Sequence, residues 1–357
     1  MLTANENRGA ASVAALARES YREIMLYSTP RGRCSVDLSD NTNLWGAPPS
    51  ALRALAAVVE TDLTRYPVAY EPALTTALAD YAGVSPEMIA CGCGSDDVLD
   101  SAIRAFAEPG EALCLAEPTF SMIPVFARAN GLSPVSIPLT PSFDADVDAM
   151  LETGARIIYL CSPNNPTGGA LPRRMVEQIV ENARGLVIID QAYVEFGGDS
   201  YIDLASCGRP VLITRTMSKA FGLAGLRVGY GIGSPQLIGE VLKARGPYKV
   251  SALAERAAIA ALENDQGWVT DRVNEVIGNR SRFRAALAER GMTPLESSAN
   301  FVLVPVADCA AVSRRLERVG IRVRVLPGLA GICDAIRIAI GPWSMMQRCL
   351  DALAAAT

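Results

Sequence analysis

Between about residue 87 and residue 245, short apolar runs alternate with stretches of helical periodicity, and this alternation constrains the fold more than any other feature. The runs have the length of strands and include 112–115, 156–160, 186–189 and 211–213. One helix between them is predicted from apolar residues at helical spacing, Leu99, Ala102, Ile103 and Phe106, with Ser95 as its N-cap. Apolar strands that alternate with helices predict an α/β fold, with a mostly parallel sheet covered by helices on both faces.

The C-terminal part has a different pattern. Helical periodicity runs from about Ser251 to Arg290, interrupted near Gly267, and a last helix is predicted over 343–355. Strand-like segments lie between them at 300–304, 320–325 and 335–340. Because 357 residues exceed the usual size of one core, we expect two domains. Residues 45–246 would form the large domain, and residues 1–44 and 247–357 a smaller α+β domain.

Composition excludes several classes of protein. The net charge is −5 and no block of Lys or Arg stands out, so no nucleic-acid or anionic-membrane partner is predicted. Residues 1–17 lack the basic and apolar regions of a signal peptide, and no run of about 18 apolar residues predicts a membrane span. Nine scattered cysteines are typical of reduced thiols in a cytoplasmic protein.

Two features of the residue inventory narrow the chemistry. The chain has no histidine, which excludes His-dependent hydrolases and His-ligated metals, and we predict no metal site. It has only three lysines, Lys219, Lys243 and Lys249, among 33 basic residues. If the protein forms an imine with a carbonyl compound, one of these three side chains provides the amine.

The segment 214–227 favours Lys219. It follows a buried strand and contains hydroxyls at Thr216 and Ser218, the amine of Lys219 and the guanidinium of Arg227. A phosphorylated aldehyde cofactor needs this set, with the amine for the imine and the other groups for the phosphate. The alternative is an exposed lysine on a surface turn.

Two further polar segments follow predicted strands. Asp190 ends the run 186–189, where a carboxylate could hold a pyridine nitrogen protonated, and Tyr193 lies three residues on. Asn165 lies in the segment 162–168, from which it could reach a ring hydroxyl. A strand-end aspartate that caps a turn, and a turn without function, are the alternatives.

Two weaker signals precede these segments. Gly92–Asp97 ends a short strand and opens a helix, so that the backbone near Ser95 and Asp96 could bind phosphate. An ordinary helix start with acidic residues in its first turn is the alternative. Phe120 could stack on a flat ring, or be a core residue.

Together these segments resemble the fold-type I pyridoxal-phosphate enzymes, and within them the histidinol-phosphate aminotransferase group, from Asp37 to Gly341. The resemblance implies pyridoxal 5'-phosphate as the cofactor, with Lys219, Asp190 and Tyr193 as catalytic residues. It implies that further residues bind the cofactor: Ser95, Asp96, Phe120, Asn165, Thr216, Ser218 and Arg227.

The resemblance also implies partners. Arg65-Tyr66-Pro67 is similar to a segment that sends a tyrosine hydroxyl into the cofactor site of the other subunit, which implies a homodimer with shared active sites. Asn43, Arg324 and Arg337 would bind the substrate. The implied reaction is amino transfer from histidinol phosphate to 2-oxoglutarate, a step of histidine biosynthesis.

Three hypotheses remain open on the sequence alone. The first is an aminotransferase, acting on histidinol phosphate or on another, aromatic amino acid. The second is an enzyme of the same fold with another outcome at the substrate carbon, such as decarboxylation of a phosphorylated amino acid, or oxidation. The third is a ligand-sensing regulator, which would carry a DNA-binding module and a basic patch that the sequence does not contain.

Overall fold

The structure is a computed structural model that describes residues 16–22, 24–26 and 34–354. The first 15 residues, part of the segment for which no signal peptide is predicted, lie outside this range. Seven strands form the larger sheet, in the order β2-β8-β7-β6-β5-β3-β4. They are β2 (Ile89–Cys93), β3 (Ala112–Glu117), β4 (Ser133–Pro138), β5 (Ile157–Cys161), β6 (Leu186–Asp190), β7 (Val211–Thr216) and β8 (Val228–Ile232).

The large sheet is mostly parallel, as the sequence predicts. All pairs from β7 to β4 are parallel, and only β8 runs antiparallel to its two neighbours. Side chains alternate between two apolar cores: on β6, Leu186 and Ile188 face one core while Val187 and Ile189 face the other. A strand buried on both faces reads as a continuous apolar run, which is why these segments could be recognised.

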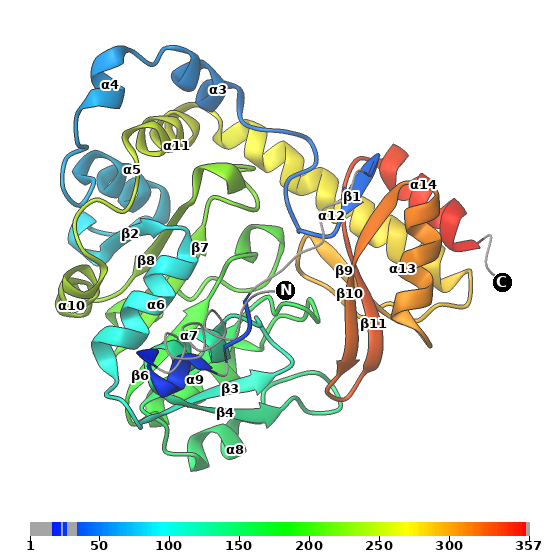
Figure 1. The fold of residues 1–357 in the computed structure, drawn as a ribbon, viewed down its shortest axis with the longest axis horizontal. Coiled ribbons are helices and arrows are strands. Elements are labelled where there is room, and N and C mark those ends of the chain that lie inside the picture. The colour runs from blue at the N-terminus through cyan, green and yellow to red at the C-terminus, as the bar shows by residue number, and fades with distance from the viewer. Residues whose placement is uncertain (1–15, 23, 27–33, 355–357) are drawn as a thin grey trace, which may run out of the picture.

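Helices cover both faces of this sheet (Figure 1). One core is closed by α6 (Ser95–Phe106), α7 (Ile123–Ala129) and α10 (Pro235–Arg245). The helices of the other core include α5 (Pro72–Ala82), α8 (Val147–Glu152), α9 (Arg173–Asn182) and α11 (Ala252–Asn264). The predicted N-cap of α6 is wrong by one residue: Gly94, with φ of 79°, takes the cap position and Ser95 is the first helical residue.

The remaining strands form a second sheet of four, in the order β1-β10-β11-β9. They are β1 (Val36–Leu38), β9 (Phe301–Pro305), β10 (Ile321–Leu329) and β11 (Cys333–Ala339). β1 pairs in parallel with β10, which lies at the other end of the chain. Two helices, α13 (Cys309–Arg318) and α14 (Trp343–Ala354), pack beside this sheet (Figure 1).

A long helix, α12 (Gln266–Ala288), runs from α11 toward the second sheet, where it contacts β9 and α14 (Figure 1). It follows α11 directly, and the break at Asp265 confirms the interruption that the sequence predicts. The helix α11 packs against α5 and against α3 (Pro49–Ala56), which belong to the predicted large domain. The domain boundaries therefore stay a prediction, although the two sheets themselves are distinct. None of the helices in the described ranges is long and apolar enough to span a bilayer.

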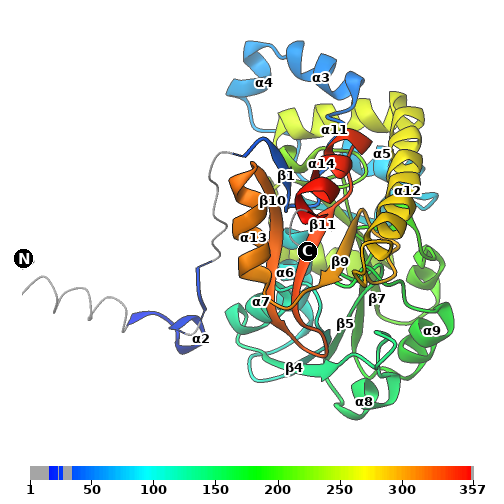
Figure 2. The same ribbon diagram turned by 90° about the vertical axis from the view of Figure 1, so that its right-hand side faces the viewer.

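Short helical elements complete the chain: α2 (Glu19–Arg22), α4 (Glu60–Thr64) and the 3-10 turns η1 (Pro86–Met88), η2 (Val194–Phe196), η3 (Ile202–Ser206) and η4 (Ala224–Leu226). Figure 2 shows α3 and α4 together at one end of the molecule. Between α4 and α5, Tyr70 and Glu71 both have positive φ, 63° and 48°. This corner is held by a buried ion pair, in which Arg245 donates to Glu71 Oε2 at 2.6 Å, with both side chains 0% exposed.

Candidate active site

Several of the predicted site residues lie at the carboxyl ends of the parallel strands. Asp190 is the last residue of β6, Thr216 is the last residue of β7, and the segment 162–168 follows β5 directly. Because these three strands are parallel neighbours, their carboxyl ends lie at one edge of the sheet. Ligands of open α/β sheets bind outside such an edge.

Asp190 is a buried carboxylate with two hydrogen bonds. It is 3% exposed, its Oδ2 accepts from the Tyr159 hydroxyl at 2.8 Å, and its Oδ1 accepts from the Ala192 N–H at 3.1 Å. Burial raises the pKa of Asp190 to about 6, although the hydrogen bond from Tyr159 opposes this rise. Within the described ranges no cation forms an ion pair with it, so the site offers a carboxylate that suits a cationic ring nitrogen.

Lys219 follows β7, and its side chain reaches the turn that follows β1 in the second sheet. Its Nζ donates to the carbonyl of Asp40 at 3.2 Å and lies 5.8 Å from the centre of the Tyr193 ring. Burial, with the nearby charge of Arg337, lowers the pKa of Lys219 to about 8. A lowered pKa increases the fraction of neutral amine near pH 7, and only the neutral amine can attack a carbonyl.

The turn that follows β1 crosses the site and contacts it with successive residues. The carbonyl of Ser39 accepts from Arg337 at 2.8 Å, and that of Asp40 accepts from Lys219. Asn41, with φ of 53°, donates through Nδ2 to the Tyr193 hydroxyl at 3.1 Å. This turn therefore connects three of the predicted site residues.

Asn165 and Arg337 are also joined. The guanidinium of Arg337 donates to Asn165 Oδ1, and the N–H groups of the same amide can act as donors. Arg337 is 8% exposed and lies directly opposite Arg324 in the β10–β11 pairing. Arg322, two residues before Arg324, instead pairs with Asp37 at 2.9 Å.

The predicted phosphate-binding groups surround the first turn of α6. Arg227, which has φ of 55°, pairs with Asp96 at 3.3 Å, and the Gly94 N–H donates to the Arg227 carbonyl at 3.0 Å. The first N–H groups of a helix have no partner within the helix. At Gly229 on β8 a Cβ atom would overlap Ser95, so glycine permits the close packing of this turn on the sheet.

The hydroxyls of Thr216 and Ser218 complete this group. Thr216 Oγ1 donates to Ser218 Oγ at 3.0 Å and accepts from the Ser218 N–H at 3.1 Å. Both residues are buried, at 5% and 6% exposure. Hydroxyls, backbone N–H groups and a guanidinium form the donor set that a phosphate dianion requires. The donor set, the lysine amine and the buried carboxylate fit pyridoxal 5'-phosphate.

Three predicted residues have contacts other than those with the groups described above. Phe120 is partly buried and packs against the core that includes α6 and α7. Asn43 uses its amide within the chain, donating to the Ala220 carbonyl at 3.0 Å and accepting from the Trp45 N–H at 3.0 Å. Tyr66 is 84% exposed and stacks on Tyr248 with ring centres 5.1 Å apart.

Sequence reasoning missed Tyr159 and Asn41. Tyr159 stands inside an apolar strand run, and a buried tyrosine hydroxyl needs a partner, so its presence there was a usable signal. The role of Asn41 depends on its left-handed conformation and on the neighbouring sheet, and no local pattern indicates these.

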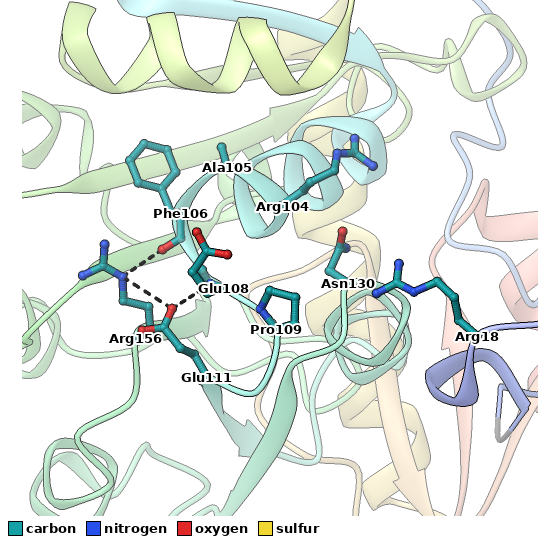
Figure 3. A pocket seen from close by; sticks show the side chains of 10 residues that line it. Arg18, Arg104, Ala105, Phe106, Glu108, Pro109, Glu111, Asn130 and Arg156 are labelled. Carbon is teal, nitrogen blue, oxygen red and sulfur yellow. Dashed lines mark hydrogen bonds and ion pairs between the residues drawn. The ribbon is translucent and has the colours of Figure 1, made fainter.

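A separate surface pocket lies elsewhere on the molecule (Figure 3). Arg18, Arg104, Glu108, Asn130 and Arg156 are among its lining residues, and none of them is a predicted site residue. It lies near the amino ends of β3 and β5, at the edge of the sheet opposite Lys219. It is therefore not the active site.

The fold and these residues define a pyridoxal-phosphate-dependent enzyme, and comparison with known proteins gives its family. Residues 34–353 match the family model described as aminotransferase class I and II. A histidinol-phosphate aminotransferase of Roseiflexus castenholzii is 38% identical over 332 residues, covering 89% of this chain and 88% of that protein. An aromatic amino acid aminotransferase of Rhodococcus jostii is 36% identical over 316 residues, covering 86% of each chain.

A solved structure shows the same fold. The crystal structure of histidinol-phosphate aminotransferase from Sinorhizobium meliloti, in complex with pyridoxal-5'-phosphate, superposes with a TM-score of 0.85 at 26% identity. It covers 96% of this chain and 97% of that one. The chain belongs to the aminotransferase class I and II family, and the prediction of an aminotransferase is confirmed.

Proposed function

We propose that this aminotransferase transfers the amino group of histidinol phosphate to 2-oxoglutarate, with Lys219, Asp190 and Tyr193 as its catalytic residues. Its bound cofactor supplies an electron-withdrawing ring that stabilises negative charge at the substrate carbon. The amine of Lys219 would hold the cofactor and would carry the proton removed from that carbon. Asp190 keeps the ring nitrogen protonated.

The remaining roles follow from the same arrangement. Asn165 and Tyr193 bind the ring oxygen, and Phe120 stacks on the ring. The cofactor phosphate is held by Ser95, Thr216, Ser218, Arg227 and the backbone of Asp96, whose carboxylate pairs with Arg227 and fixes its guanidinium. Asn43 holds the turn 39–43 against the Lys219 segment through Ala220, and so acts on the substrate side of the site.

The two arginines that lie opposite each other support histidinol phosphate as the substrate. Arg324 and Arg337 lie directly opposite each other on neighbouring strands, and a phosphate dianion can use two guanidinium groups where a carboxylate needs one. Histidinol phosphate carries its phosphate on the carbon that replaces the α-carboxylate of an amino acid. One site must therefore accept a phosphate in one half-reaction and a carboxylate in the other.

A second candidate is an aromatic amino acid aminotransferase, which the relative from Rhodococcus jostii favours. In that reaction both substrates carry an α-carboxylate, so a second arginine would give no advantage to one donor over the other. The two candidates can therefore be separated by comparing donors in single half-reactions.

We expect histidinol phosphate to convert the enzyme-bound cofactor rapidly, and the two arginine variants to differ. Arg337→Lys should slow the half-reactions of histidinol phosphate and glutamate alike, by about 10- to 100-fold, because lysine cannot donate two parallel hydrogen bonds. Arg324→Ala should slow histidinol phosphate about 10-fold more than glutamate. The change in cofactor absorbance after rapid mixing measures each half-reaction.

Arg322→Ala is the matched control for these variants. It lies on the same strand as Arg324 but pairs with Asp37, so it should not change the ratio of the two donor rates. No reaction of the wild type with histidinol phosphate, or equal losses for both donors in Arg324→Ala, would instead support an aromatic or other amino-acid aminotransferase.

We also propose a homodimer in which each active site is shared. The end of the molecule formed by α3, α4 and the following loop exposes large apolar side chains: Leu52, Val59, Leu63, Tyr66 and Val68 are 56–84% exposed. Contiguous exposed apolar residues mark protein interfaces. A second copy that covers this end would bury them and bring its Tyr66 hydroxyl to the phosphate-binding groups.

Hybrid dimers test this assembly. Tyr66→Phe should weaken cofactor binding about 10-fold, the usual effect of one lost hydrogen bond to a charged group. Co-expression with Lys219→Ala chains should produce hybrids with one intact site, and about a quarter of wild-type activity at limiting cofactor. Tyr248→Phe, which keeps the stacked ring, is the control and should bind cofactor normally. A fully active monomer in sedimentation would rule out the shared site.

The proposal also covers the domain organisation of the protein and its cellular compartment. We propose residues 45–246 as the cofactor-binding domain, with the four-stranded sheet at the centre of the small domain. All nine cysteines are free thiols, which supports a reducing compartment and hence the cytoplasm.

A further inference from the structure

Tyr159 and Asp190 form a buried pair within the large sheet. Tyr159 is the third residue of β5, is 1% exposed, and has apolar neighbours in the core that α6 and α7 close. Its hydroxyl donates to Asp190 Oδ2 at 2.8 Å. A buried hydroxyl without a partner would be costly, so the carboxylate satisfies a group that the apolar core cannot.

The register of two strands fixes this contact. Tyr159 lies opposite Ile188 on β6, and Asp190 is two residues further along the same strand and on the same face. Diagonal neighbours at this spacing are within reach of an aromatic side chain. The hydrogen bond is therefore set by the rigid centre of the sheet and not by a loop.

The charges in this pair favour one proton arrangement. Burial and the neighbouring carboxylate raise the pKa of the Tyr159 phenol, so the phenol stays protonated and donates. Burial raises the pKa of Asp190, and the hydrogen bond from Tyr159 acts in the opposite direction. Without this donor the buried carboxyl would more readily take up a proton and become neutral.

We propose that Tyr159 is a positioning residue that keeps Asp190 ionised and directed at the ring nitrogen of the cofactor. The inference rests on the proposed function, in which Asp190 pairs with that nitrogen. A neutral or rotated carboxyl could not keep the ring nitrogen protonated. The ring would then stabilise negative charge at the substrate carbon less well. Tyr159 contacts neither the cofactor nor the substrate in this scheme, and acts through Asp190 alone.

The test compares Tyr159→Phe with the wild type using two cofactors. Each full-length protein is loaded with pyridoxal 5'-phosphate or with its analogue in which the ring nitrogen is replaced by C–H. The dissociation constant is measured from the loss of bound cofactor absorbance on dilution. We expect Tyr159→Phe to bind pyridoxal 5'-phosphate about 10-fold more weakly than the wild type, the loss usual for one hydrogen bond to a charged group. We expect both proteins to bind the analogue equally, because it has no ring nitrogen to contact.

Tyr201→Phe is the matched control. Tyr201 is also fully buried, but its hydroxyl donates to the Leu171 carbonyl at 2.7 Å and not to the Asp190 carboxylate. Its removal should leave the ratio of the two dissociation constants unchanged. A second comparison distinguishes the proposed role from a general loss of packing. On an Asp190→Asn background, Tyr159→Phe should not change the ratio of the two cofactor dissociation constants any further.

The possible outcomes separate this inference from the proposed reaction. Equal weakening of both cofactors by Tyr159→Phe would show a purely structural residue and overturn the proposal, as would unchanged binding of both. A wild type that does not distinguish the two cofactors would overturn it together with the role of Asp190. None of these measurements uses an amino donor, so they are independent of whether histidinol phosphate is the substrate.

Discussion

Lys219→Ala should abolish the visible absorbance band of the bound cofactor and lower turnover by at least about 10⁴-fold. The variant loses both the covalent attachment of the cofactor and the group that carries the proton from the substrate carbon. The fold should tolerate it, because the Nζ of Lys219 makes one hydrogen bond, to the Asp40 carbonyl, in the part of the chain that the structure describes. Absorbance spectra and steady-state rates at saturating cofactor would measure the two effects.

The other two lysines provide the controls. Lys243 lies on the exposed side of α10 and pairs with Glu240, so Lys243→Ala should leave spectrum and rate unchanged. Lys249 pairs with Asp97 at 2.9 Å, close to the phosphate-binding groups, and is the nearest competitor. A Lys219→Ala protein in which borohydride still fixes the cofactor, at Lys249 or Lys243 by peptide mass analysis, would contradict the assignment.

Glu71→Ala should lower the free energy of unfolding by about 3–5 kcal/mol, because it leaves the buried charge of Arg245 without a partner. The pair is 2.6 Å long and neither side chain is exposed. It also holds two successive residues, Tyr70 and Glu71, in a left-handed conformation that non-glycine residues rarely adopt. Urea unfolding of the holoenzyme, at fixed protein and cofactor concentrations, would give the change.

A double variant distinguishes the loss of the ion pair from the cost of leaving one buried charge without its partner. Glu71→Gln with Arg245→Met removes both charges, and should be more stable than either single variant, since apolar groups can replace a buried ion pair at little cost. The exposed pair of Lys243 and Glu240 on the same helix is the control and should contribute no more than about 1 kcal/mol. A loss for Glu71→Ala no larger than that of this surface pair would contradict the prediction.

The sequence predicted the large sheet well because its strands are buried on both faces. Runs such as 157–161 and 186–190 are apolar throughout, and a strand of this kind needs no knowledge of its partners to be recognised. The sequence predicts Ser95 as the N-cap of α6, but the structure has Gly94, one residue earlier, in that position. The cap position follows from the backbone conformation of Gly94, with φ of 79°, which the composition does not reveal.

The candidate site was predictable where each group follows a strand. Asp190 and Thr216 end neighbouring parallel strands, so their meeting required only the order of the strands in the sheet. The links between the two sheets were not predictable. The bonds from Arg337 to Asn165 and from Asn41 to Tyr193 depend on how the second sheet packs against the first, and each partner is more than 150 positions away in the sequence.

The pairing of β1 with β10 has a consequence for how this protein is made. The two strands are joined through residues such as Asp37 and Arg322, which are 285 positions apart. On a ribosome that adds about 5–20 residues per second, β1 emerges roughly 15–60 s before the strand it needs. During that interval the edge of β1, and the turn that follows it and contacts Lys219, have no partner from the second sheet. In contrast, every strand of the seven-stranded sheet has been synthesised by residue 232. The nascent enzyme should therefore build its cofactor sheet first, and a pause or a chaperone acting late in translation would affect the contacts that the second sheet and the turn after β1 make with the active site.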